Sequence, residues 1–125
     1  MSSATLQELK DIYQSLLTKT RTSNDCILYG NGDDKYHRIR RQLNCGRSIH
    51  IYVHQLALLV KTNSLEISKD LECSHLCHKK SCIYFDHIVA EPHGINMNRK
   101  ACFNERVDRG LNSFCFGHPG YENCI

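Results

Sequence analysis

The sequence contains no tryptophan and no long apolar run. A membrane-spanning helix needs about 20 consecutive apolar residues, so we expect no membrane association. Residues 1–10 carry neither the basic start nor the apolar stretch of a secretory signal, and an intracellular location is therefore expected. A chain of 125 residues corresponds to one domain with a modest core.

Acidic residues are missing between Asp34 and Glu66, and this gap makes the local charge far more basic than the formal net charge of +3 indicates. A solvated surface without a ligand usually mixes both signs, whereas a long band of one sign indicates a face that binds a polyanion such as nucleic acid. Charge alone does not distinguish DNA from RNA. The basic side chains of this stretch are Lys35, His37, Arg38, Arg40, Arg41, Arg47, His50, His54 and Lys61.

The hydrophobic pattern predicts an α+β fold. Apolar residues recur at helical spacing over residues 4–18, where Thr5 and Glu8 have the spacing of a capping box. Alternating patterns predict strands at 26–29, 36–43 and 47–52, followed by a helix at 53–60 and another short strand at 65–71. Residues 1–20 thus form an N-terminal helix and 26–60 a basic antiparallel sheet with a helix. Beyond Cys73 the spacing of cysteines and histidines replaces the hydrophobic period, so 73–124 is predicted to be held by metal.

Eight cysteines in a chain without a secretory signal favour metal binding over disulfides. The alternative is a secreted domain stapled by disulfides, but here histidines alternate with the cysteines at ligand spacing. Cys77, Cys82 and His87 are each separated by four residues and supply three ligands of a tetrahedral zinc site. The fourth ligand comes from Cys26, Cys45 or Cys73. Cys26 is favoured because it would tie the N-terminal half to this loop.

A second set of ligands follows towards the end of the chain. It consists of Cys102, Cys115, His118 and Cys124, with the short Cys-x2-His step of a zinc knuckle. Four protein ligands leave no open coordination position, so this zinc is predicted to be structural.

A histidine lies inside the first ligand loop without being needed as a ligand. His75 would crowd the tetrahedron if it bound zinc, whereas a neutral imidazole held there is suited to be a general base. The plainer interpretation is a structural histidine, and we keep that interpretation for His78. Farther along, the run contains Asp86, Glu91, Asn96 and Arg99.

With these residues the sequence resembles the His-Cys box homing endonucleases, a branch of the ββα-metal (His-Me finger) nucleases. The motif is Ser74-His75-Leu76-Cys77-His78, followed by Cys82, Asp86-His87, Glu91, Asn96, Arg99 and Cys102. The resemblance implies a small zinc-stabilised His-Me finger fold with an antiparallel sheet, flanking helices and two structural zinc sites. It also implies the ligand sets Cys26, Cys77, Cys82, His87 and Cys102, Cys115, His118, Cys124.

For the reaction, the resemblance implies that His75 activates the attacking water and that Asn96, at the start of a helix to about Ala101, holds one Mg²⁺. It implies an arginine near the scissile phosphate, for which Arg47 is the best match and Arg40 or Arg41 the alternative. The expected activity is Mg²⁺-dependent hydrolysis of DNA phosphodiester bonds. The residues expected to contact DNA are Arg38, Arg40, Arg41, Arg47 and His50.

Two other functions are compatible with the pattern: a catalytically silent zinc-stabilised DNA-binding module and a zinc-stapled protein-interaction domain. The presence of both His75 and Asn96 favours the nuclease over the silent DNA-binding module. The stretch without acidic residues between Asp34 and Glu66 disfavours the protein-interaction domain. The resemblance implies DNA as the partner and a nuclear location. It allows a homodimer, although this sequence ends at Ile125 without the family's C-terminal swapping tail.

Overall fold

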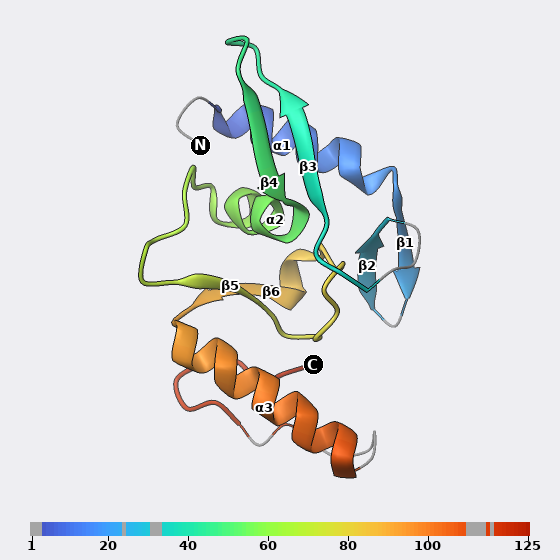
Figure 1. The fold of residues 1–125 in the computed structure, drawn as a ribbon, viewed down its shortest axis with the longest axis vertical. Helices are drawn as coiled ribbons and strands as arrows, with labels where there is room; N and C mark the ends of the chain where they lie inside the picture. Colours follow the sequence, from blue (N-terminus) through green and yellow to red (C-terminus); the bar gives the residue numbers. More distant parts are fainter. Residues whose placement is uncertain (1–3, 24, 31–33, 110–114, 116) are drawn as a thin grey trace.

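The computed structural model describes residues 4–23, 25–30, 34–109, 115 and 117–125. Within these ranges the strands pair as three two-stranded antiparallel sheets, β1–β2, β3–β4 and β5–β6. Helices lie beside them (Figure 1). The elements in chain order are α1 (Leu6–Leu17), β1 (Thr20–Ser23), β2 (Cys26–Tyr29), β3 (Arg38–Gln42), β4 (Ser48–Tyr52), α2 (Val53–Thr62), β5 (Glu72–His75), η1 (Phe85–His87), β6 (Ile88–Glu91) and α3 (His93–Arg109).

Helix α1 begins at the capping box that the sequence predicts. The Thr5 hydroxyl accepts the Glu8 backbone N–H at 3.1 Å, and the Glu8 carboxylate accepts the Thr5 N–H at 3.2 Å. The helix buries Leu9, Tyr13 and Leu16, which share one face because of their 3.6-residue period. The Tyr13 hydroxyl donates to a backbone carbonyl of the loop before η1, so α1 also fastens that loop.

The hairpin β3–β4 and helix α2 form the centre of the hydrophobic core. Alternation along the hairpin buries Ile39, Ile49 and Ile51 on one face. Helix α2 is almost entirely buried and packs on α1 and β6. In Figure 1 the hairpin extends away from the pair β5–β6, with its turn at the far end. That turn is made at Gly46, whose φ of +91° is a conformation that glycine adopts without strain.

Strands β5 and β6, followed by α3, make a ββα unit at the other end of the molecule (Figure 1). The register pairs Glu72 with Glu91 and His75 with Ile88. Helix α3 begins two residues after β6, so it turns back over the start of β5. The predicted α+β fold class is therefore confirmed, with antiparallel pairing divided among three small sheets.

Three local predictions were wrong. Residues 18–25, which the sequence predicts to be a polar connector, contain the strand β1, because Thr20 to Ser23 find a hydrogen-bonding partner in β2. Residues 65–71 form no strand; the N–H of Leu71 instead closes a turn on the carbonyl of Ser68 at 3.0 Å. The strand that follows is β5, which was not predicted. The helix expected at 96–101 is longer at both ends. Among the described residues, no helix has the length and apolar character needed to cross a membrane.

Candidate metal centres and active-site pocket

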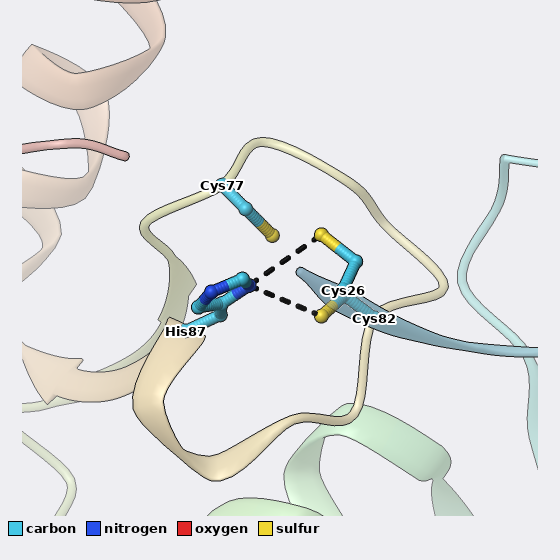
Figure 2. A group of neighbouring side chains, drawn as sticks. All are labelled: Cys26, Cys77, Cys82 and His87. Atoms are coloured by element: carbon cyan, nitrogen blue, oxygen red, sulfur yellow. Dashed lines mark hydrogen bonds between the residues drawn. The ribbon is translucent and has the colours of Figure 1, made fainter. Parts of the chain in front are cut away.

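Centre 1 consists of Cys26 on β2, Cys77 and Cys82 in the loop after β5, and His87 at the end of η1. Their ligand atoms all lie within 4.8 Å of one another. The Nδ1 of His87 is 3.4 Å from the Sγ of Cys26 and 3.6 Å from that of Cys82. Figure 2 shows the four side chains pointing towards one another. Three thiols and an imidazole in this arrangement fit the tetrahedral coordination of a structural zinc.

Backbone pairing brings the distant Cys26 to this loop. The N–H of Ile83 donates to the carbonyl of Ile27 at 2.8 Å, and the N–H of Tyr29 donates to the carbonyl of Ser81 at 2.9 Å. Of the three candidates for the fourth ligand, the structure brings Cys26 to the group. Cys45 lies in the exposed hairpin turn, and Cys73 is packed beside α2, where burial raises the pKa of its thiol to about 12.

Centre 2 consists of Cys102 on α3 with Cys115, His118 and Cys124 from the C-terminal segment, again within 4.8 Å of one another. The Nε2 of His118 lies 3.3 Å from the Sγ of Cys124. Two backbone N–H groups, of Gly117 and Cys124, donate to the Sγ of Cys115 at 3.4 and 3.3 Å. Burial raises the pKa of Cys115, but these donors outweigh it and the pKa is lowered. The thiolate, which is the form that binds zinc, is thereby favoured.

A buried ion pair and the end of the chain fasten centre 2 to the rest of the domain. Arg99 on α3 and Glu91 on β6 are each only 1% exposed, and the Nη2 of Arg99 donates to the Oε2 of Glu91 at 2.9 Å. The Nη1 of the same guanidinium donates to the Sγ of Cys124 at 3.5 Å. The N–H of Ile125 donates to the carbonyl of Leu76 at 2.8 Å. Centre 2 is thus fastened both to β6 and to the first ligand loop.

A pocket of about 510 Å³ opens beside centre 1 and is lined by two of the three residues predicted for catalysis, His75 and Asn96. The proposed pair therefore shares one opening, and His75 is not among the residues grouped around either centre. The lining is strongly basic and includes aromatic rings. The pocket is lined by Asp34, Tyr36, Cys73, His75, Cys77, His78, Lys79, Lys80, Asn96, Arg99, Lys100, Phe103 and Asn104.

The orientation of His75 is set by a residue of centre 1. Its Nε2 lies 2.9 Å from the backbone carbonyl of Cys82. A carbonyl only accepts, so Nε2 carries the proton and Nδ1 is left as the basic nitrogen. The ring is 9% exposed and packs against His54 at 5.1 Å and Tyr36 at 6.2 Å between centroids. Burial lowers the pKa of His75, so the ring is neutral at pH 7.

Asn96 lies in the first turn of α3, which begins at His93. Its Nδ2 donates to the Oε1 of Glu72 at 2.6 Å, and the Nδ1 of His93 is 3.0 Å from the same oxygen. The hydrogen bonds from Asn96 and His93 lower the pKa of Glu72. Sequence reasoning missed Glu72 and His93, because neither has a spacing that points to metal or catalysis.

The predicted DNA-contacting residues lie on the hairpin but at different distances from the pocket. Arg38 pairs with Tyr52 and Arg40 with His50 in the register, and Arg38, Arg40 and His50 are on its exposed face. Arg41 alternates to the other face and is half-buried. The guanidinium of Arg38 lies 5.2 Å from the centroid of the Tyr52 ring, and Tyr52 in turn contacts Tyr36, which lines the pocket.

Arg47 is not brought to the pocket. It closes the turn of the hairpin, where its carbonyl accepts the N–H of Leu43 at 2.7 Å. Tyr52 lies five residues after Arg47 along an extended strand, a span of about 17 Å. Of the arginines proposed from the sequence, Arg38 lies at the end of the hairpin nearest His75.

Taken together, these features define a small zinc-stabilised His-Me finger domain. The family model described as the zinc-binding loop region of homing endonuclease matches residues 13–123, and the chain belongs to that family. The resemblance noted from the sequence is therefore confirmed. No curated protein and no solved structure matches the chain. Within the described residues no cysteine forms a disulfide bond, and the eight zinc-type residues instead gather in two groups that could each hold one ion.

Proposed function

We propose that the protein is a DNA endonuclease that hydrolyses phosphodiester bonds with His75 as general base. The observation that carries the proposal is the hydrogen bond between the Nε2 of His75 and the carbonyl of Cys82. Burial favours the neutral ring, and this bond then leaves Nδ1 as its basic nitrogen, in a pocket that Asn96 shares. The ring is also held by aromatic neighbours, so a base of defined tautomer and orientation is prepared before substrate arrives.

The reaction follows from these groups. The Nδ1 of His75 takes a proton from a water molecule, and the water oxygen attacks phosphorus as the bond to the 3′ oxygen breaks. The 3′ oxygen takes a proton from solvent as it leaves, so the products are a 5′-phosphate and a 3′-hydroxyl. Lys80 and Lys100 line the same pocket, and their charges attract the phosphate.

Mg²⁺ is the cation that we propose for this pocket. The donor chemistry fits, since the amide oxygen of Asn96 is the kind of hard ligand that Mg²⁺ takes, with water and substrate oxygens completing its shell. When bound, the ion supplies positive charge that stabilises the phosphate and the leaving oxygen. The two structural sites are proposed to hold zinc through the side chains of centres 1 and 2.

We assign the arginine that contacts the scissile phosphate to Arg38 in place of Arg47. The position of Arg38 at the pocket end of the hairpin supports this assignment. Arg40 and His50 continue the exposed face away from the pocket and are proposed to contact the flanking DNA backbone. Arg38→Ala is therefore expected to reduce the cleavage rate strongly, while Arg47→Ala reduces chiefly the affinity for DNA and its dependence on salt.

Nicking of supercoiled plasmid tests the proposal. Zinc-loaded wild type is expected to nick with Mg²⁺ and not with EDTA-treated buffer. His75→Ala should lower the rate about 10²–10⁴-fold, as expected when a general base is removed, and Asn96→Ala should remove the response to Mg²⁺. Asn98→Ala is the matched control, because Asn98 lies on the same helix, is exposed, and donates from its Nδ2 to the backbone carbonyl of Gly94 at 3.3 Å.

Binding without nicking is the contrary outcome. If wild type and all variants bind the plasmid equally and none nicks it, the protein is a DNA-binding module and the proposed hydrolysis is wrong. Zinc content and circular dichroism, measured on each variant, separate a lost catalytic group from a lost fold.

A further inference from the structure

The Glu72 carboxylate contacts the predicted cation ligand Asn96, and nothing in the sequence context of Glu72 marks it. It begins β5, opposite Glu91 on β6. Helix α3 starts two residues after Glu91, and this tight return brings His93 and Asn96 over Glu72. The contacts are short: 2.6 Å from the Nδ2 of Asn96 to Oε1, and 3.0 and 3.1 Å from the Nδ1 of His93 to the two carboxylate oxygens.

The negative charge of the Glu72 carboxylate decides which side of the Asn96 amide faces it. A glutamate carboxylate is ionised at neutral pH and can only accept hydrogen bonds. It therefore admits the NH₂ side of the amide and repels the oxygen side. With Nδ2 against Glu72, the Oδ1 of Asn96 is directed to the other side of the amide group, and Asn96 lines the pocket that contains His75.

Glu72 itself is outside that pocket. Of the described residues that line it, Asn96 is one and Glu72 is not. The carboxylate is half-exposed, and His93 contacts it from the solvent side, with 71% of its side chain exposed. Glu72 can thus act on a cation in the pocket through Asn96, in the way that outer carboxylates orient the ligands of metal sites.

We propose that Glu72 is a positioning residue that holds the amide of Asn96 with its oxygen towards the pocket, in the orientation needed to bind a divalent cation. His93 braces the carboxylate in turn. The inference rests on the proposed function, since it names the device that prepares the cation ligand of the same site. It concerns the geometry of Asn96 before any ion binds.

The first test reads the amide directly and needs no cleavage. In ¹⁵N-resolved NMR spectra of the zinc-loaded protein, the Nδ2 signal of Asn96 is identified by its loss in Asn96→Ala. We expect one of its protons to be shifted downfield and to exchange slowly. Glu72→Ala should remove both properties, and Glu72→Gln, which keeps an acceptor oxygen, should retain part of them. Glu66→Ala removes an exposed carboxylate of the same region and should change neither.

The second test measures the Mg²⁺ concentration that gives half-maximal nicking. Loss of an outer-shell partner typically costs 10–100-fold in metal affinity, so Glu72→Ala should raise this concentration about 10-fold or more. Glu72→Gln should raise it less, and Glu66→Ala not at all. DNA affinity of the zinc-loaded proteins measured without added Mg²⁺ should be the same in wild type and Glu72→Ala, because the cation ligand is not used there.

The outcomes separate this inference from the proposed function. An unchanged amide signal or an unchanged Mg²⁺ response in Glu72→Ala overturns the positioning role, while the nuclease proposal stands if Asn96→Ala has lost its response. If Glu72→Ala loses more of the Mg²⁺ response than Asn96→Ala does, Glu72 is a direct ligand of the cation, and the positioning role is again overturned. If Asn96→Ala nicks like wild type, it is the proposed function that fails.

Discussion

The two ends of this molecule are held together by different physics. Helices α1 and α2 and the hairpin β3–β4 share an apolar core, with Leu9, Leu16 and Leu56 fully buried. The segment from β5 onward adds Ile83 and Ile88 to the edge of this core, and its other fixed points are the two Cys/His groups and the pair Glu91–Arg99. The pocket lies in this second region. Precise placement of His75 and Asn96 therefore depends on ligands and hydrogen bonds more than on hydrophobic packing.

Removing a ligand of centre 1 should have the largest effect. Binding of a structural zinc contributes about 10–16 kcal/mol in zinc-finger peptides, which exceeds or equals the whole stability of most domains, about 5–15 kcal/mol. Cys82→Ala should therefore lose one zinc per chain by elemental analysis. It should also lose amide-exchange protection in the loop and α3 while α2 keeps more of its protection, and it should not nick DNA.

Cys45→Ala is the matched control for this change, because Cys45 lies in the exposed hairpin turn. Two zinc ions per chain and unchanged protection are expected for it. If Cys82→Ala also retained two zinc ions and full protection, centre 1 would not hold this half of the molecule, and the contrast between the two regions would be wrong.

A cavity in the core should have a smaller effect of a different kind. Leu56 on α2 is completely buried, and Leu56→Ala should lower the free energy of unfolding by about 2–5 kcal/mol. Urea denaturation measures this change. The zinc content should stay at two per chain, since no ligand is touched. The control Leu65→Ala, at a position that is 39% exposed, should lower the free energy of unfolding by less than about 0.5 kcal/mol. A drop to one zinc ion per chain in Leu56→Ala would show that the two regions are not held separately.

Loss of the helix cap should be the smallest of the three changes. Thr5→Ala removes the acceptor for the first turn of α1 and should cost about 0.5–2 kcal/mol in thermal or urea unfolding. The Mg²⁺ dependence of nicking should be unaffected, because α1 is remote from the pocket. Lys10→Ala, an exposed change within the same helix, should be nearly neutral; equal losses in the two variants would mean that the cap contributes nothing.

Local signals in the sequence foretold much of this structure. The capping box at Thr5, the amphipathic α1 and the hairpin alternation each depend on neighbours a few residues away, and each was predicted. The Cys-x4-Cys-x4-His spacing from Cys77 to His87 is a signal of the same kind. Arg47 shows the limit of prediction from local signals, because its distance from the pocket depends on where the hairpin turns and on which of its ends faces β5. Strand β1 and the residue Glu72 were missed for a similar reason, since both acquire their partners only by strand pairing.

The order of residues along the chain by itself determined the chemistry: which thiols, imidazoles and amides were present, and at what spacing they could meet within one loop or one turn of helix. Only the tertiary structure decided which distant groups join them. Pairing of β2 with the ligand loop delivered Cys26, and the return of α3 over β5 placed Asn96 against Glu72. The reason is physical: contacts between residues far apart in the chain are selected by packing and pairing of the whole fold, which no local spacing encodes.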